Sequence, residues 1–257
     1  MSKTKFLGVI IDNKLTWLPQ IDDLRKRLKS ATGMLTRIRH NIPRENYKSL
    51  YYTLFESHLS YCITVFGGVA KTHMDKLFRA QKHCMRILFG DLEAYLDKFK
   101  TCARTRKYGE QILGSDFFCK EHTKPLFTEL DILACANIYN HRTCLETLKI
   151  LKYREPASLY KLYNQSSRSN LLITPTPSTQ ITYTGAKLLN SAIKNITKKE
   201  YPVNIKIGPF KTNMKKCLLL IQKMYDVEDW YPANFDIETA TRTKIEQPET
   251  NSFNFIH

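Results

Sequence analysis

The fold is decided first by residues 21–42, which read IDDLRKRLKSATGMLTRIRHNI. Apolar residues recur in this stretch at alternating intervals of three and four positions: Ile21, Leu24, Leu28, Ala31, Leu35, Ile38 and Ile42. This spacing places them along one side of an α-helix, where they can pack along a neighbouring helix. The other sides are mainly basic. We therefore expect a long helix with one buried seam and cationic flanks.

The same reasoning predicts further helices toward the C-terminus. Pro43 suits the first turn of a helix, which would present on one face Tyr47, Leu50, Tyr51, Leu54, His58 and Tyr61. Thr72 and Asp75 resemble a capping box that begins a helix running to about Leu88. Other helical patterns cover 125–135, 137–152, 186–196 and 211–225. The sequence thus predicts a mainly α-helical chain.

Residues 5–17, KFLGVIIDNKLTW, have a different pattern. A β-rich run is followed by Asp12 and Asn13, which are typical turn residues, and then by a short return strand that ends at Trp17. The pattern predicts a β-hairpin. A lone hairpin of this length is marginally stable in water, so we expect it to belong to a larger sheet.

Composition limits the class of protein. Of the 257 residues, 42% are hydrophobic and 11% aromatic, which excludes wholesale disorder. No apolar run reaches the roughly 18 to 20 residues of a membrane-spanning helix, and the N-terminus lacks a secretory signal. The seven cysteines have no paired spacing, which favours a reducing compartment. We expect a soluble, intracellular protein with no membrane partner, in either the nucleus or the cytoplasm.

The charge indicates the partner. Forty Lys and Arg residues against 24 Asp and Glu give a formal net charge of +16, and the excess precedes the acidic tail after Trp230. The positive electrostatic potential of such a chain attracts polyanions. Nucleic acid is therefore the leading partner class, and an anionic membrane surface is the alternative.

Two groups of basic residues could contact phosphates. Arg79, Lys82, His83 and Arg86 share one face of a predicted helix, and a second cluster includes Arg25, Lys26 and Lys29. Either group alone could be an ordinary solvated helix face. Several basic helices without matching acids favour phosphate contact.

Candidate catalytic and metal sites have simpler interpretations. Asp22 and Asp23 could in principle hold metal ions, but they follow Pro19 in the first turn of the predicted helix, where acids complement the helix dipole. Two pairs, Cys119 with His122 and His141 with Cys144, have zinc-compatible residue types in an unusual order. Nucleotide-binding and hydrolase motifs are absent from the sequence. We therefore predict no catalytic residues, no metal site and no cofactor for this chain.

Several ordered motifs carry a family resemblance. They are Lys5-Phe-Leu-Gly-Val-Ile-Ile-Asp with Leu15-Thr-Trp17; Leu54-Phe-x-Ser-His58-Leu-Ser-Tyr61; Leu77-x3-Gln81-Lys-x3-Arg86-Ile; Pro125-Leu-Phe-x-Glu-Leu-x-Ile-Leu133 with Ile138-Tyr139; Ser167-Arg-Ser-Asn170; and Tyr183-Thr-Gly-Ala-Lys-Leu-x-Asn190. In this order the chain resembles the C-terminal part of the reverse transcriptase of LINE-type, jockey-like non-LTR retrotransposons. The resemblance extends to about residue 196.

The resemblance implies a role for each region. Phe6, Leu7 and Gly8 would form the primer grip, and residues 1–17 would be a remnant of the polymerase palm. Residues 18–163 would be a helical thumb-like region beside the template–primer duplex, residues 164–185 a Ser/Thr/Pro-rich linker, and residues 186–257 a C-terminal extension with an acidic tail. Gly8, lacking Cβ, would allow close approach of a nucleic-acid backbone.

The resemblance also implies a limit. In this family the metal-binding palm aspartates precede the Phe-Leu-Gly segment, so we expect no polymerisation by this chain alone. Mg²⁺ is expected only for the complete parent RNA-directed DNA polymerase. The implied partners are RNA or an RNA–DNA duplex, and the missing palm and fingers of the same polyprotein.

Three hypotheses follow from the sequence. The chain is a polymerase fragment that binds RNA or template–primer duplex without sequence preference, a helical protein-interaction module built on the seam from Ile21 to Ile42, or a non-functional relic that does not fold stably.

Overall fold

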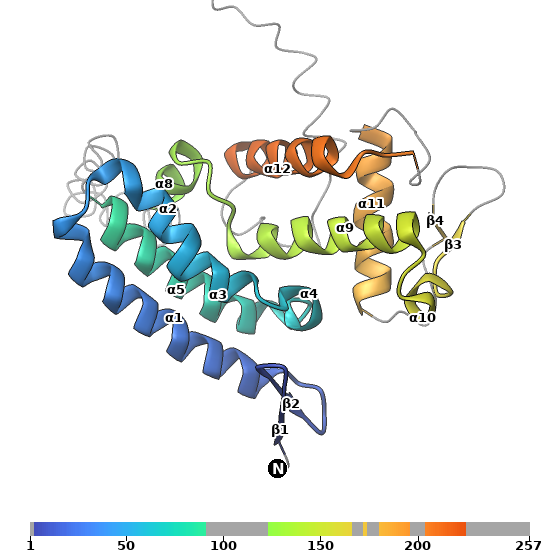
Figure 1. Cartoon of the computed structure of the whole chain (residues 1–257), viewed down its shortest axis with the longest axis horizontal. Helices are drawn as coiled ribbons and strands as arrows, with labels where there is room; N and C mark the ends of the chain where they lie inside the picture. Colours follow the sequence, from blue (N-terminus) through green and yellow to red (C-terminus); the bar gives the residue numbers. More distant parts are fainter. Residues whose placement is uncertain (1–2, 91–122, 166–171, 174–179, 196–203, 225–257) are drawn as a thin grey trace, which may run out of the picture.

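A computed structural model of the chain describes residues 3–90, 123–165, 172–173, 180–195 and 204–224 (Figure 1). The longer helices are α1 (Leu18–Ile38), α5 (Lys71–Phe89), α9 (Cys135–Tyr153), α11 (Gln180–Asn195) and α12 (Ile207–Met224). The shorter ones are α2 (Tyr47–Leu50), α3 (Ser57–Ser60), α4 (Ile63–Phe66), α8 (Lys124–Glu129) and α10 (Ala157–Tyr160). Tighter or wider helical turns are η1 (Arg39–Asn41), η2 (Arg44–Asn46) and η3 (Tyr51–Glu56).

The strands form small antiparallel pairs. β1 (Lys3–Phe6) pairs with β2 (Val9–Asp12), and β3 (Asn164–Gln165) pairs with β4 (Leu172–Ile173). The predicted fold class, mainly helical with an N-terminal hairpin, is thus confirmed.

Helix α9 lies at the centre of the described structure. It runs between α12 and the α3–α4 region, and α11 crosses it near its C-terminal half (Figure 1). Fourteen of its 19 residues are buried, so neighbours cover it on almost every side. This explains why α9 lacks the single apolar stripe of a surface helix.

Helix α1 buries the predicted seam. Five of its members, Ile21, Leu24, Leu28, Ala31 and Leu35, are at most 3% exposed, and α1 packs mainly against α5. The helix ends at Ile38, before the predicted end of the seam, because η1 follows as a tighter turn.

Residues 44–60 form one helical stretch whose middle turn is widened. In η3 the amide of Ser57 donates to the carbonyl of Tyr52, five residues earlier. Tyr51, Phe55 and Leu59 are fully buried at intervals of four, which suits a wider turn than the α-helical one. The predicted face is therefore partly wrong. It includes His58 and Tyr61, which are exposed.

The N-terminal hairpin turns at Leu7 and Gly8, not at Asp12 and Asn13 as the sequence suggested. Phe6 lies opposite Val9, so the loop has two residues. Leu7 and Gly8 have positive φ, 45° and 81°, as a type I′ turn requires. Glycine adopts such values without strain. Leu-Gly lacks the Asn-Gly signature that is usual for this turn, whereas Asp12 and Asn13 are typical turn residues. The residue types therefore predicted the turn at the wrong position.

Asp12 instead connects the hairpin to α1. Its carboxylate accepts hydrogen bonds from the amide and hydroxyl of Thr16, at 3.1 and 2.9 Å, and from the amide of Trp17 at 3.0 Å. Burial raises the pKa of Asp12, but these hydrogen bonds outweigh it and leave the pKa lowered. The residues expected to form the return strand therefore form the connection into α1.

Helix α5 begins one residue before the predicted cap. Ala70 is its N-cap, and no side chain caps the helix. The expected capping box at Thr72 and Asp75 is therefore wrong, because both residues already lie inside the first turns.

Other helix boundaries also differ from the sequence expectation; α12, for example, begins at Ile207 and not at residue 211. Helix α8 ends at Glu129 and Asp131 has a φ of +51°, so the expected helix over 125–135 stops early. Helix α11 begins at Gln180, inside the range 164–185 expected to be a linker, and β3 and β4 also fall in that range.

Two buried glutamines hold the link between α8 and α9. Gln81 of α5 is fully buried. Its Nε2 donates to the Leu133 carbonyl at 2.9 Å and to the Tyr51 hydroxyl at 2.8 Å, and its Oε1 accepts from the Cys135 amide at 2.8 Å. One side chain of α5 thus satisfies two backbone groups that precede or begin α9.

Gln222 of α12 does the same from another direction. Its Oε1 accepts from the Ala134 amide at 2.8 Å and from Asn137 Nδ2 at 3.0 Å. Its Nε2 donates to the Ile132 carbonyl at 3.0 Å. The backbone of residues 132–135 is therefore bound by side chains from α5 and α12, which fixes both helices relative to α9.

Replacing Gln81 by methionine, which is similar in size and flexibility, should leave the Leu133 carbonyl and Cys135 amide buried without a partner. Each such group costs about 1 to 3 kcal/mol, so we expect the free energy of unfolding to fall by about 3 kcal/mol in urea titrations. Asn213→Ala, at an exposed position of α12, should change it by no more than about 0.5 kcal/mol. Equal midpoints for the two variants would contradict this account.

Candidate nucleic-acid interface

The basic side chains of α5 form a stripe on its outer side, here called the α5 stripe: Arg79, Lys82 and Arg86. Arg79 and Arg86 are exposed, and each Nε donates to a carbonyl one turn earlier, Asp75 O at 3.4 Å and Lys82 O at 3.3 Å. Lys82 is half-buried, with Nζ 4.9 Å from the centre of the Phe78 ring. The stripe therefore follows the helix axis over two turns.

The charges of the α5 stripe act on one another. Burial lowers the pKa of Lys82, and the positive charges of Arg86 and Arg79 lower it further, against the opposite effect of Asp75. Cations that repel one another at this range gain from a bound anion. The exposed His83 lies next to the stripe. Arg79, Lys82 and Arg86 are therefore close enough for their charges to interact, as residues on one helix face would be.

The second group, here called the α1 patch, consists of Arg25, Lys26 and Lys29, which are all exposed. Arg25 Nη1 lies 3.6 Å from Asp22 Oδ1, and both side chains are about half exposed. Such a pair contributes little to stability and yields readily to a competing phosphate. The first turn of α1 contains no acid, so the predicted role of Asp22 and Asp23 in complementing the helix dipole is wrong. They pair instead with Arg25 and Arg27 of the same helix.

The hairpin turn is fastened to the helical body. Phe6 and Leu7 are 62% and 73% exposed, but the Leu7 carbonyl accepts a hydrogen bond from the Tyr61 hydroxyl at 2.6 Å. The Gly8 carbonyl lies 3.5 Å from Arg27 Nη2, and Arg27 also pairs with Asp23 at 2.6 Å. The structure thus brings Phe6, Leu7 and Gly8 together and displays two apolar side chains to solvent.

Gly8 has a local reason to be glycine. A Cβ at this position would meet Tyr61 at 3.7 Å, an ordinary contact, whereas the φ of +81° would strain another residue. Tyr61 and Arg27, which hold the turn, were not recognised from the sequence as part of this site. The sequence placed Tyr61 on one face of a helix, and a contact between residues 54 positions apart leaves no periodic signal.

The candidate zinc ligands are not brought together within the described residues. Cys119 and His122 lie outside them. His141 and Cys144 are buried in α9, where burial lowers the pKa of His141 to about 4 and raises the pKa of Cys144. Within the described ranges, no group of three or more His, Cys, Asp or Glu side chains could hold a metal ion. In the same part of the chain, none of the helices combines the length and apolar character needed to cross a membrane.

Comparison with known proteins gives one partial relation. Over 89 residues the chain is 29% identical to the RNA-directed DNA polymerase from mobile element jockey of Drosophila funebris, a match that covers 34% of this chain. The match spans only 10% of that polymerase. No protein-family model matches the chain, and neither does any solved structure. The chain is therefore distantly related to a retrotransposon RNA-directed DNA polymerase.

Removing the hydroxyl of Tyr61 should loosen the hairpin. We expect Tyr61→Phe to accelerate hydrogen exchange of the β2 amides by about fivefold, because one net hydrogen bond contributes about 1 kcal/mol. Tyr153→Phe, at another exposed tyrosine, is the matched control and should leave exchange in β2 unchanged. Identical exchange in the two variants would show that this hydrogen bond does not anchor the turn.

Proposed function

We propose that the chain is the thumb-containing C-terminal part of a retrotransposon reverse transcriptase, and that it binds RNA or template–primer duplex without reading sequence. The observation that carries the proposal is the α5 stripe, in which three cations are held within two helical turns and repel one another. Contacts to phosphates position a protein on a nucleic acid without specifying bases. The net charge and the distant relation to a mobile-element polymerase support the same function.

The other expected roles belong to the same proposal. Phe6, Leu7 and Gly8 would approach the primer end as the primer grip, and the α1 patch would add phosphate contacts to those of the α5 stripe. Residues 1–17 would complete a palm supplied by another part of the parent polyprotein. The catalytic aspartates and their Mg²⁺ ions would lie in that palm, so this chain would bind nucleic acid without polymerising it.

The interaction-module hypothesis loses its main support. It required the seam that begins at Ile21 to be available to a partner, but α1 buries that seam against the rest of the chain, mainly α5. The α1 patch and, in the α5 stripe, Arg79 and Arg86 are exposed, and their charge favours a polyanion.

Binding should depend steeply on salt. We expect the affinity for a fluorescently labelled RNA–DNA duplex, measured by anisotropy from 50 to 200 mM KCl, to fall linearly on a log–log plot. Combined Arg79→Glu, Lys82→Glu and Arg86→Glu substitutions should weaken binding at least about tenfold and reduce the slope by about 2 to 3, because up to three phosphate contacts are lost.

The matched control changes the net charge equally. Lys161→Glu, Lys187→Glu and Lys216→Glu alter three exposed lysines outside the α5 stripe and the α1 patch and should weaken binding far less. Equal losses in the two triple variants, or an affinity that does not change with salt, would refute the proposed interface. Circular dichroism should confirm that both variants remain helical.

A further inference from the structure

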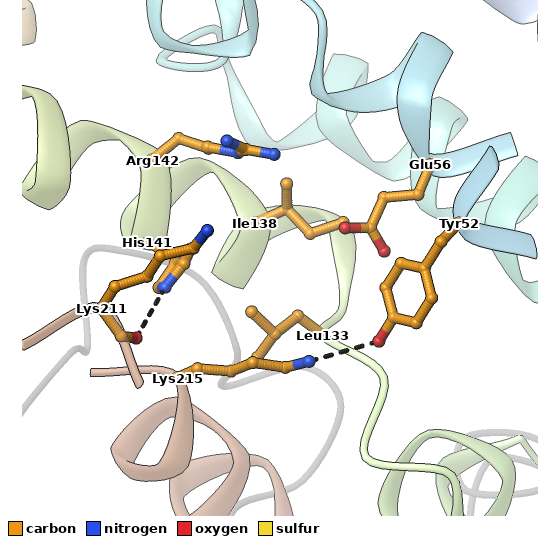
Figure 2. Close-up of a pocket in the computed structure, with 8 residues that line it drawn as sticks. All are labelled: Tyr52, Glu56, Leu133, Ile138, His141, Arg142, Lys211 and Lys215. Atoms are coloured by element: carbon orange, nitrogen blue, oxygen red, sulfur yellow. Dashed lines mark hydrogen bonds between the residues drawn. The ribbon is translucent and has the colours of Figure 1, made fainter. Parts of the chain in front are cut away.

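A pocket of about 180 Å³ lies where η3, α9 and α12 meet (Figure 2). Its lining residues are Tyr52, Glu56, Leu133, Ile138, His141, Arg142, Lys211 and Lys215. Three of these side chains are basic and one is acidic. The pocket shares no residue with the α5 stripe, the α1 patch or the hairpin turn, and it has room for several water molecules or a small ligand.

The side chains of Lys215 and Tyr52 meet at one side of the pocket (Figure 2). Lys215 Nζ donates a hydrogen bond to the Tyr52 hydroxyl oxygen at 3.3 Å and lies 5.4 Å from the centre of its ring. Burial, with the charges of Glu56 and Asp131, raises the pKa of Tyr52 to about 12. The hydroxyl therefore keeps its proton, and because it accepts from Lys215 it can donate that proton to a ligand.

His141 contributes no positive charge. Its Nε2 lies 3.1 Å from the Lys211 carbonyl oxygen, which can only accept, so Nε2 carries a hydrogen. Burial lowers the pKa of His141 to about 4, and the neighbouring positive charges of Arg142, Lys211 and Lys215 act in the same direction. The imidazole is neutral near pH 7 and its orientation is fixed by the backbone of α12.

Glu56 contains an oxygen without a partner. Its Oε2 is buried and has no hydrogen-bond partner within the described residues. Burial raises the pKa of Glu56 to about 7, although the charges of Lys215 and Arg142 oppose the rise. Buried polar atoms are nearly always hydrogen-bonded. An unpartnered carboxyl oxygen beside two cations therefore indicates an arrangement that a ligand would complete.

We propose that this pocket binds an oxyanion of the phosphate class, with Arg142, Lys215 and the Tyr52 hydroxyl as donors. Arginine can present two parallel N–H groups to such an anion, and lysine supplies a compact charge. Protonated Glu56 donates a further hydrogen bond from its carboxyl group. A cationic ligand is disfavoured because three basic residues line the same space, and an apolar one would leave the donors unsatisfied.

The carboxyl group of Glu56 gives the site a pH dependence with a definite sign. Below about pH 7, Glu56 is neutral and donates. Above it, the carboxylate repels the anion and attracts the cations that would hold it, so affinity falls as pH rises. The other titratable or charged groups that face Glu56 are Tyr52, His141, Arg142, Lys211 and Lys215. The pKa values of Tyr52 and His141 lie well outside pH 6 to 8, so they do not produce this change.

Sulfate is the cleanest probe, because its charge is constant between pH 6 and 8. Isothermal titration calorimetry of the full chain with sodium sulfate, at ionic strength fixed with NaCl, should detect one site that weakens several-fold from pH 6 to 8. Lys215→Met keeps the apolar stem and should weaken binding at least about tenfold, since a charge-assisted hydrogen bond is lost. Lys216→Met, at the adjacent exposed position, should bind like the unaltered chain.

Glu56→Gln separates the pH effect from the fold. The amide is nearly isosteric and still donates, so this variant should bind sulfate at pH 8 about as tightly as the unaltered chain does at pH 6, without pH dependence. Absence of binding in the folded chain, equal affinities for the two lysine variants, or an unchanged pH profile in Glu56→Gln would each overturn the proposal.

The ligand could be free phosphate or the terminal phosphate of a nucleic acid. Inorganic phosphate, a 5′-phosphorylated oligoribonucleotide and its 5′-hydroxyl counterpart should therefore be compared as competitors of sulfate. Stronger competition by the 5′-phosphorylated form than by the other two would identify a terminal phosphate, whereas competition by inorganic phosphate alone would identify the free ion. The Arg79, Lys82 and Arg86 triple variant should retain sulfate binding, so failure of the proposed duplex interface would not be mistaken for failure of this site.

Discussion

Residues 132–134, just before α9, are buried without forming regular structure, and the two glutamines that satisfy their backbone groups determine how the helices are assembled. Buried amide and carbonyl groups require partners. Residues 132–135 find theirs in Gln81 and Gln222, which reach the link from α5 and α12. Hydrophobic packing alone would allow these helices to slide. The paired amide contacts specify one position for each along α9.

The hydrogen bonds of Gln81 and Gln222 also position residues that line the proposed anion pocket. Leu133, whose carbonyl Gln81 holds, lines the pocket. Gln222 fixes the C-terminal part of α12, and the rigid helix carries Lys215 to its place opposite Tyr52. Glu56 comes from the widened turn η3, whose neighbour Phe55 is buried in the core. Three segments distant in sequence thus converge because the same link is bound from two sides.

The sequence predicted the periodic features of the fold, but neither the exact local geometry of turns and helix ends nor the contacts between distant segments. The seam of α1 follows from its spacing, and the exposure of Arg79 and Arg86 follows from their position on α5. The type I′ turn at Leu7 and Gly8, the wide turn η3 and the early end of α8 depend on local geometry that composition does not encode. The pocket was beyond prediction, because Glu56 was one acid in an aromatic run and its partners come from α9 and α12. A burial-raised pKa has no signature in sequence.

The motifs behind the family resemblance have structural explanations that help to separate scaffold from function. A Cβ at Gly185 would lie 2.1 Å from Thr147 Oγ1, so this glycine lets α11 approach α9. Asn190 makes two hydrogen bonds of 2.8 Å with the backbone of Leu172. One motif of α5 contains both kinds of residue. Gln81 belongs to the scaffold, and Lys82 and Arg86 belong to the proposed phosphate-binding surface.

The inward contacts of Gln81 have an outward consequence. The three hydrogen bonds of Gln81 prevent α5 from turning about its axis. Arg86, five positions later, therefore faces solvent, and Lys82, the next residue, lies half-buried at the edge of the core. The buried amide therefore holds the cations of the α5 stripe outward at fixed spacing, although it contacts none of them. Because side chains held in place in the free protein lose less entropy on binding, the same contacts that fix the core would favour the proposed binding of a phosphate backbone.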